Sequence, residues 1–86
     1  MSIEQTLAER AEKYGTFRTH ANISQQLQNA LIAKPEWDNL NASQREALIM
    51  ICHKIARVLN GDPNYVDNWH DIAGYATLIE QELTSA

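Results

Sequence analysis

The stretch that decides the fold runs from Leu48 to Leu83 and reads LIMICHKIARVLN (48–60), GDPNYVD (61–67) and NWHDIAGYATLIEQEL (68–83). In its first and last segments apolar residues recur every three or four positions, the period of an α-helix with one apolar face. The first stripe consists of Leu48, Ile51, Cys52, Ile55, Val58 and Leu59. The second consists of Trp69, Ile72, Ala73, Ala76, Ile79 and Leu83, widened on one flank by Tyr75 and Leu78.

Helix start and stop signals give these two segments their boundaries. A Ser43–Glu46 capping-box spacing predicts a start for the first helix, which we expect over about residues 44–59. Asn60–Gly61 is a C-cap signal, and Asp67 or Asn68 is expected to cap a helix that runs to about residue 83. A connection this short favours antiparallel neighbours, so we predict an antiparallel C-terminal helix pair.

The N-terminal half predicts two further helices. Ser2 and Gln5 have capping-box spacing, and Gly15 is suited to end a helix over about residues 3–13. A second helix is expected over about residues 19–33 and is ended by Pro35. The segment 34–42 reads as a turn or one loose helical turn. The sequence therefore predicts an all-α, four-helix single domain over residues 1–86.

Length and composition restrict the class of protein. The chain has 86 residues, a net charge of −4 and one cysteine, Cys52. An acidic balance argues against nucleic acid as a partner, and a lone cysteine suits a reducing compartment. We expect no signal peptide and no membrane span, because the sequence shows neither a basic start followed by an apolar stretch nor an apolar run of membrane length. We expect a cytoplasmic protein with a thin core, and a homo-oligomer, most simply a dimer, because the apolar arc of the last helix is wide.

Five residues of the C-terminal pair are candidates for binding a ligand or partner: Lys54, Arg57, Asp67, Asp71 and Tyr75. Asp67 and Asp71 are four positions apart and share a helix face. Asp71 lies next to Tyr75 on the helical wheel, where a carboxylate is partly desolvated unless it is paired. One interpretation is a metal or phosphate-linked site. The alternative, which the positions favour, is an ion pair across the hairpin to Lys54 or Arg57.

Other polar and small residues give weaker signals. His20, His53 and His70 have no metal-ligand spacing, and His53 and Arg57 are expected to point away from the apolar stripe of their helix. Gly74 lies inside a predicted helix, where glycine is unfavourable, so a close approach of another chain or ligand is one explanation.

An aromatic cluster surrounds the first predicted turn. Tyr14 and Gly15 are followed by Phe17. This cluster either forms the floor of a pocket or packs on the core, and packing is the favoured interpretation. Gly61 is explained by the helix end without a phosphate-binding role.

Three motifs carry a family resemblance: RAEKYG (10–15), KIARVLNGD (54–62) and DNWHDIAGY (67–75). They resemble a small family of phage and prophage domains of unknown function, which is distantly similar to the MazG-like all-α nucleotide pyrophosphatases and to nucleotide-modification-associated domains. The resemblance covers most of the chain and implies an all-helical fold and a phage origin, with a bacterial host cell as the compartment.

The MazG-like activity is not carried over with the resemblance. MazG-like enzymes hold magnesium with a Glu-Glu-x-x-Glu cluster on one helix and further acids on another. At that spacing this chain has Gln25, Gln26 and Asn29, and amides are poor substitutes for carboxylates around magnesium. We therefore expect no metal, no cofactor and no catalytic residues.

Two functions follow as hypotheses. The first is a small non-catalytic phage accessory protein, a protein-interaction module such as an inhibitor of a host enzyme or defence complex. The alternative is a MazG-like protein that binds a nucleotide or other small ligand in a helical cleft. An enzyme is the weakest of the three interpretations.

Overall fold

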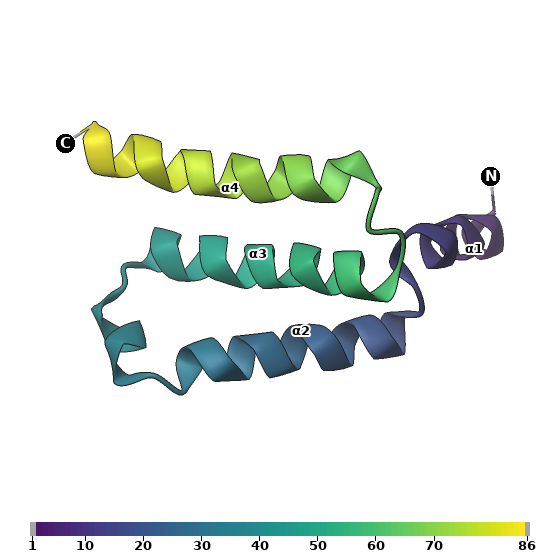
Figure 1. Cartoon of the computed structure of the whole chain (residues 1–86), viewed down its shortest axis with the longest axis horizontal. Helices are drawn as coiled ribbons and strands as arrows, with labels where there is room; N and C mark the ends of the chain where they lie inside the picture. The colour runs from purple at the N-terminus through teal and green to yellow at the C-terminus, as the bar shows by residue number, and fades with distance from the viewer. Residues whose placement is uncertain (1, 86) are drawn as a thin grey trace.

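A computed structural model describes residues 2–85 and confirms the all-α prediction. This part of the chain forms α1 (Ile3–Tyr14), α2 (Phe17–Ile32), a short 3-10 helix η1 (Pro35–Asn39), α3 (Ala42–Asn60) and α4 (Val66–Thr84), and it contains no strand. The helices α3 and α4 run in opposite directions side by side, as predicted (Figure 1).

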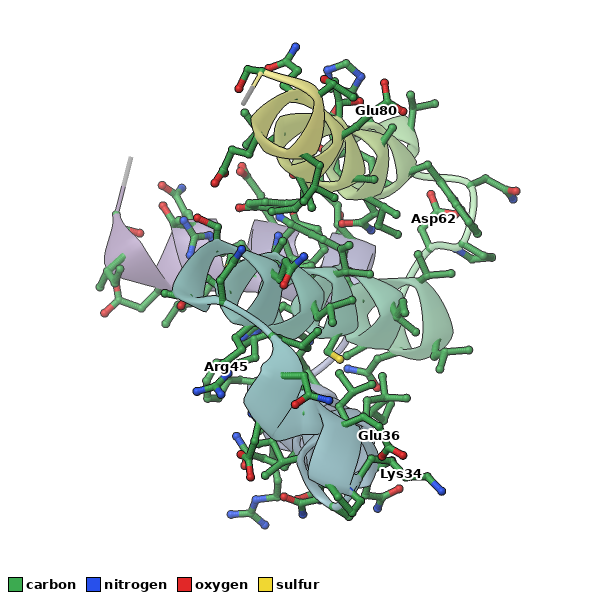
Figure 2. All side chains as sticks on the ribbon, turned by 90° about the vertical axis from the view of Figure 1, so that its left-hand side faces the viewer. Lys34, Glu36, Arg45, Asp62 and Glu80 are labelled. Carbon is green, nitrogen blue, oxygen red and sulfur yellow. The ribbon has the colours of Figure 1, made fainter. Side chains whose placement is uncertain are left out.

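The three longer helices form a flat layer and not a closed bundle. Helix α3 lies in the middle with α2 on one side and α4 on the other, while α1 extends from one end of the layer (Figure 1). Viewed end-on, α4, α3 and α2 are stacked in a row, and α1 crosses behind α3 at the far end and projects beyond the row on one side (Figure 2). The molecule as a whole is elongated, with extents of 44 × 28 × 22 Å. Helix α1 therefore lies at one end of the layer and covers neither of its broad faces along their length (Figure 1).

Three of the four predicted helix starts need correction. The Ser2–Gln5 capping box of α1 is present with both bonds, but α2 begins at Phe17, where Thr16 is the N-cap, and not near Thr19. Helix α3 is capped by Asn41 and Gln44 and not by the Ser43–Glu46 pair. An Asn-x-x-Gln capping box makes the same two kinds of hydrogen bond as Ser-x-x-Glu. The sequence therefore offers two overlapping capping boxes, and the helix begins at the earlier one.

The start of α4 was also predicted wrongly. Tyr65 is the N-cap and makes no side-chain cap bond, so the expected capping by Asp67 or Asn68 does not occur. Asn68 lies inside the first turn and is 1% exposed. The Trp69 indole N–H instead donates to the Pro63 carbonyl at 2.8 Å, which fixes the preceding turn.

Helix α3 is buried on two opposite sides because it has a neighbour on each. Its buried residues are mostly small: Ala47, Cys52 and Ala56, together with Lys54. These small side chains let α2 and α4 come close, whereas the bulky residues of the predicted stripe stay half-exposed, and Leu59 is exposed. The expectation of one buried apolar face on this helix was therefore too simple.

The predicted apolar stripe of α4 is only partly buried. Ile72 and Ile79 are half-buried, as are Asp71 and Tyr75, so this edge of the helix faces α3. The rest of the stripe is exposed to solvent: Trp69, Ala73, Ala76 and Leu83. The apolar arc is wider than one neighbouring helix can cover.

Two glycines allow the α1–α2 turn to meet the α3–α4 turn. Gly15 has φ +77°, and a Cβ there would collide with the Asn60 carbonyl oxygen, while a Cβ at Gly61 would collide with the backbone of Lys13 and Tyr14. The Asn60 amide nitrogen donates to the carbonyls of Tyr14 and Thr16, at 2.8 and 2.9 Å. This contact, here called the turn junction, consists of residues 13–16 and 60–62. It is completed by the Asp62 N–H, which donates to the Lys13 carbonyl at 2.8 Å.

We predict opposite effects for two glycine-to-alanine substitutions. Gly15→Ala should lower the free energy of unfolding by at least about 1–2 kcal/mol, because alanine disfavours a left-handed conformation and its Cβ meets backbone. Gly74→Ala should raise it by about 1 kcal/mol, because a Cβ at this helical position meets nothing within 4 Å among the described residues. Urea denaturation followed by circular dichroism measures both. Equal changes in the free energy of unfolding for the two variants would contradict the close backbone contact at the turn junction.

Candidate functional site

The predicted ion pair between α3 and α4 is present. The Lys54 Nζ atom lies 2.9 Å from an Asp71 carboxylate oxygen; the Lys54 side chain is 11% exposed and that of Asp71 is 43% exposed. The hydrogen bond from Lys54 lowers the pKa of Asp71, with smaller contributions from the charges of Lys54, His70 and Arg57, against the opposing effect of desolvation. Because the ammonium is the buried partner, this pair is a structural link between the two helices.

The other predicted site residues do not join this pair in a single cluster. Asp67 is exposed and interacts with Tyr65, whose pKa is raised mainly by the hydrogen bond with that carboxylate. Tyr75 is half-buried beside α3. Arg57 points away from the apolar stripe of α3, and its guanidinium carbon lies 4.3 Å from the centre of the Tyr14 ring.

A cavity of about 390 Å³ lies where α1, α2 and α3 meet. The aromatic cluster Tyr14, Gly15 and Phe17 contributes to its wall, so the pocket interpretation of that cluster describes its position better than core packing does; Phe17 is 81% exposed. The full set of lining residues is Leu7, Arg10, Ala11, Tyr14, Gly15, Thr16, Phe17, His20 and Arg57. The cavity is open to solvent and directly adjoins the turn junction.

His20 is the most buried side chain of this lining, at 8% exposed. Its ring stacks on His53 of α3 with 5.6 Å between ring centres, so His53, which was expected only to point away from the apolar stripe, packs against α2. Burial lowers the pKa of His20, and electrostatic interactions with His53, Arg57 and Lys54 lower it further. The imidazole is therefore neutral at pH 7, and its Nδ1 atom has no hydrogen-bond partner in the described part of the chain.

Sequence patterns alone did not predict this cavity. Arg10 and His20 were not among the predicted site residues, and Arg57 was assigned to a site with Asp71. The aromatic cluster was the signal that pointed here, but Arg10 and Arg57 are too far apart in sequence for any spacing rule to join them. Only the turn junction brings them to one place.

The described residues give no metal centre. Within residues 2–85, no group of three or more His, Cys, Asp or Glu side chains is arranged to hold a metal ion. The amides Gln25, Gln26 and Asn29 all lie exposed on α2. Cys52 is buried and unpaired, and burial raises the pKa of its thiol. None of the helices in this part of the chain has the length and apolarity to cross a membrane.

We predict that breaking the Lys54–Asp71 pair from the acidic side is the more costly change. Asp71→Asn leaves a buried ammonium without its counter-charge, whereas Lys54→Met leaves a carboxylate that water can reach. Thermal denaturation at pH 7 should give a melting temperature several degrees lower for Asp71→Asn and a smaller decrease for Lys54→Met. The reverse order would show that the lysine charge is not desolvated. Unchanged stability in Asp71→Asn with loss of ligand binding would make Asp71 a functional group.

The Lys54–Asp71 pair should also make the stability of the fold depend on pH in the acidic range. The folded-state pKa of Asp71 is lowered, so between that value and the unfolded value of about 4 the unfolded chain binds more protons and stability rises with pH. This contribution is complete above about pH 4 and is lost as pH falls through the folded pKa. It should be missing from Asp71→Asn in denaturation curves measured from pH 2 upward, whereas Asp67→Asn serves as a matched control.

A family model described as a domain of unknown function (DUF6378) matches residues 3–83, which include all four helices except the last residue of α4. No curated protein and no solved structure matches the chain. The match leaves the phage origin and the MazG-like similarity as hypotheses. It spans nearly the whole chain, and the chain belongs to the DUF6378 family.

Proposed function

We propose that this protein is a small non-catalytic protein-interaction module that works as a homodimer, with a second copy of the chain covering the open side of its helical layer. In a phage or prophage setting its target would be a host enzyme or defence complex, a role suited to a small acidic protein. The observation that carries the proposal is the amount of surface that a single chain leaves exposed.

That surface is large for a chain of this mass. The accessible surface is 6233 Å², against about 5,200 Å² expected for a compact monomer of 9.8 kDa. The radius of gyration is 14.8 Å, against about 12 Å expected for this length. The excess of about 1,000 Å² is comparable to the roughly 800 Å² that each partner buries in a standard interface. A second copy would therefore bring the exposed area per chain to an ordinary value.

Part of the exposed apolar surface is continuous along one side of the layer. At 100° per residue, the bulky stripe of α3 and the exposed stripe of α4 fall on the same side, opposite to Arg57 and Asp71. Helix α1 meets the layer only at its end, where Tyr14 contacts Arg57 on the other side (Figure 1). We call the side that carries the two stripes the open face; it consists of Leu48, Ile51, Ile55, Leu59, Trp69, Ala73, Ala76 and Leu83. Exposed apolar surface of this extent is typical of an interface.

One substitution and its neighbour test the dimer. Ala76→Glu places a charge on the open face, and Thr77→Glu places the same charge one position along α4, on the side directed away from α3. Both positions are exposed in the single chain, so neither change should unfold it. Light scattering across the micromolar range should give a dimer mass for the parent and Thr77→Glu, and a monomer mass for Ala76→Glu. A monomeric parent would end the proposal.

The second candidate function is binding of a nucleotide or other small ligand in a helical cleft. The cavity at the turn junction favours it, because two arginines and two aromatic rings line one concave site. This cavity lies on the side of the layer opposite to the open face, so a dimer and a ligand would not compete for the same surface.

A further inference from the structure

We propose that the cavity beside the turn junction binds a small organic phosphate with a flat ring, of the mononucleotide type, and that Arg10 and Arg57 hold its phosphate group. This inference deepens the second candidate function and does not depend on the dimer. It starts from the charge of the cavity. The chain has a net charge of −4, yet the nine described lining residues include Arg10, Arg57 and His20 and no carboxylate.

The position of Arg57 suits an anion. Its guanidinium carbon lies 4.3 Å from the centre of the Tyr14 ring, and a guanidinium stacked on a ring keeps its N–H edge available in a fixed plane. Such an edge donates two parallel hydrogen bonds to a phosphate. Arg10, from α1, lines the same cavity and adds a second positive charge.

The backbone contributes positive potential at the same place. The first residues of α2 line the cavity, with Thr16 as N-cap and Phe17 as first helical residue. The Thr16 hydroxyl accepts from the Thr19 N–H, and the earlier N–H groups of a helix have no intrahelical acceptor. The start of a helix favours a phosphate for this reason. Here it coincides with two arginine side chains.

The buried imidazole of His20 borders the same cavity. It is 8% exposed, its Nδ1 atom has no partner in the described residues, and the positive charges of Arg57 and Lys54 of α3 act on it. Across the cavity, α1 presents Arg10 and Tyr14. A phosphate would offset this charge, and its binding should therefore raise the pKa of His20.

The remaining lining residues are the reason for proposing a ligand with a flat ring. Tyr14 and the exposed Phe17 provide aromatic surface, and Leu7 and Ala11 add aliphatic surface. A volume of about 390 Å³ is within the range of small-molecule sites. Inorganic phosphate alone would leave this apolar part of the cavity unused.

Titration of the full chain with three probes tests the inference: AMP, inorganic phosphate and adenosine, followed by NMR and calorimetry. We expect AMP to bind most tightly, phosphate more weakly, and adenosine at least about tenfold more weakly than AMP, as expected when charge-assisted hydrogen bonds are missing. AMP should also raise the pKa of His20, read from its ring protons. Adenosine binding as tight as that of AMP would leave ligand binding standing and would overturn the phosphate site.

Three charge-matched variants locate the site. Arg57→Gln and Arg10→Gln should each weaken AMP binding by about tenfold or more, because each removes a charged donor. Arg18→Gln is the control: it removes the same charge from the exposed start of α2, outside the cavity lining. Arg10 is exposed on α1, so its variant should fold even where Arg57→Gln is destabilised. No response to millimolar AMP and phosphate, or equal losses in Arg10→Gln and Arg18→Gln, would overturn the inference.

Discussion

The fold depends on a constraint at the middle helix: α3 must pack against α2 on one side and α4 on the other. Small residues meet this constraint, since Ala47 and Ala56 are buried and let the neighbouring helices approach. The Lys54–Asp71 pair then fixes α4 against α3 through a lysine that is itself buried. The bulky apolar residues are left at the broad surface of the layer. Thus the interior of the single chain is thin, and its most hydrophobic surface faces outward.

This arrangement separates two surfaces with different chemistry. The open face is apolar and extends over α3 and α4, whereas the cavity is cationic and is formed with α1 on the other side. Arg57 shows how one helix contributes to both sides: it stacks on Tyr14 beside the cavity, while Leu59, two residues later, belongs to the open face. A two-sided middle helix therefore accounts for both proposed functions.

Local signals predicted the helices better than they predicted the site. The Ser2–Gln5 box, the Gly15 and Gly61 helix ends and the Lys54–Asp71 pair depend on residues close in sequence or across one short hairpin, and the structure confirms them. The predicted start of α3 was wrong because Asn41 and Ser43 both begin a valid capping box. The cavity was not predicted because Arg10 and Arg57 meet only through tertiary contacts. The stacking of His20 on His53 was not predicted because it requires α2 to pack beside α3.

The turn junction has a consequence for the order of folding. Asn60 bonds to carbonyls 46 and 44 residues earlier in the chain, whereas α2, α3 and α4 are joined through short connections between consecutive elements. Contacts between distant residues form late, because the closure of a long loop must come first. The helical layer should therefore form before α1 docks. The cavity would then be the last part of the molecule to be completed, and its occupant would meet a chain whose other helices are already in place.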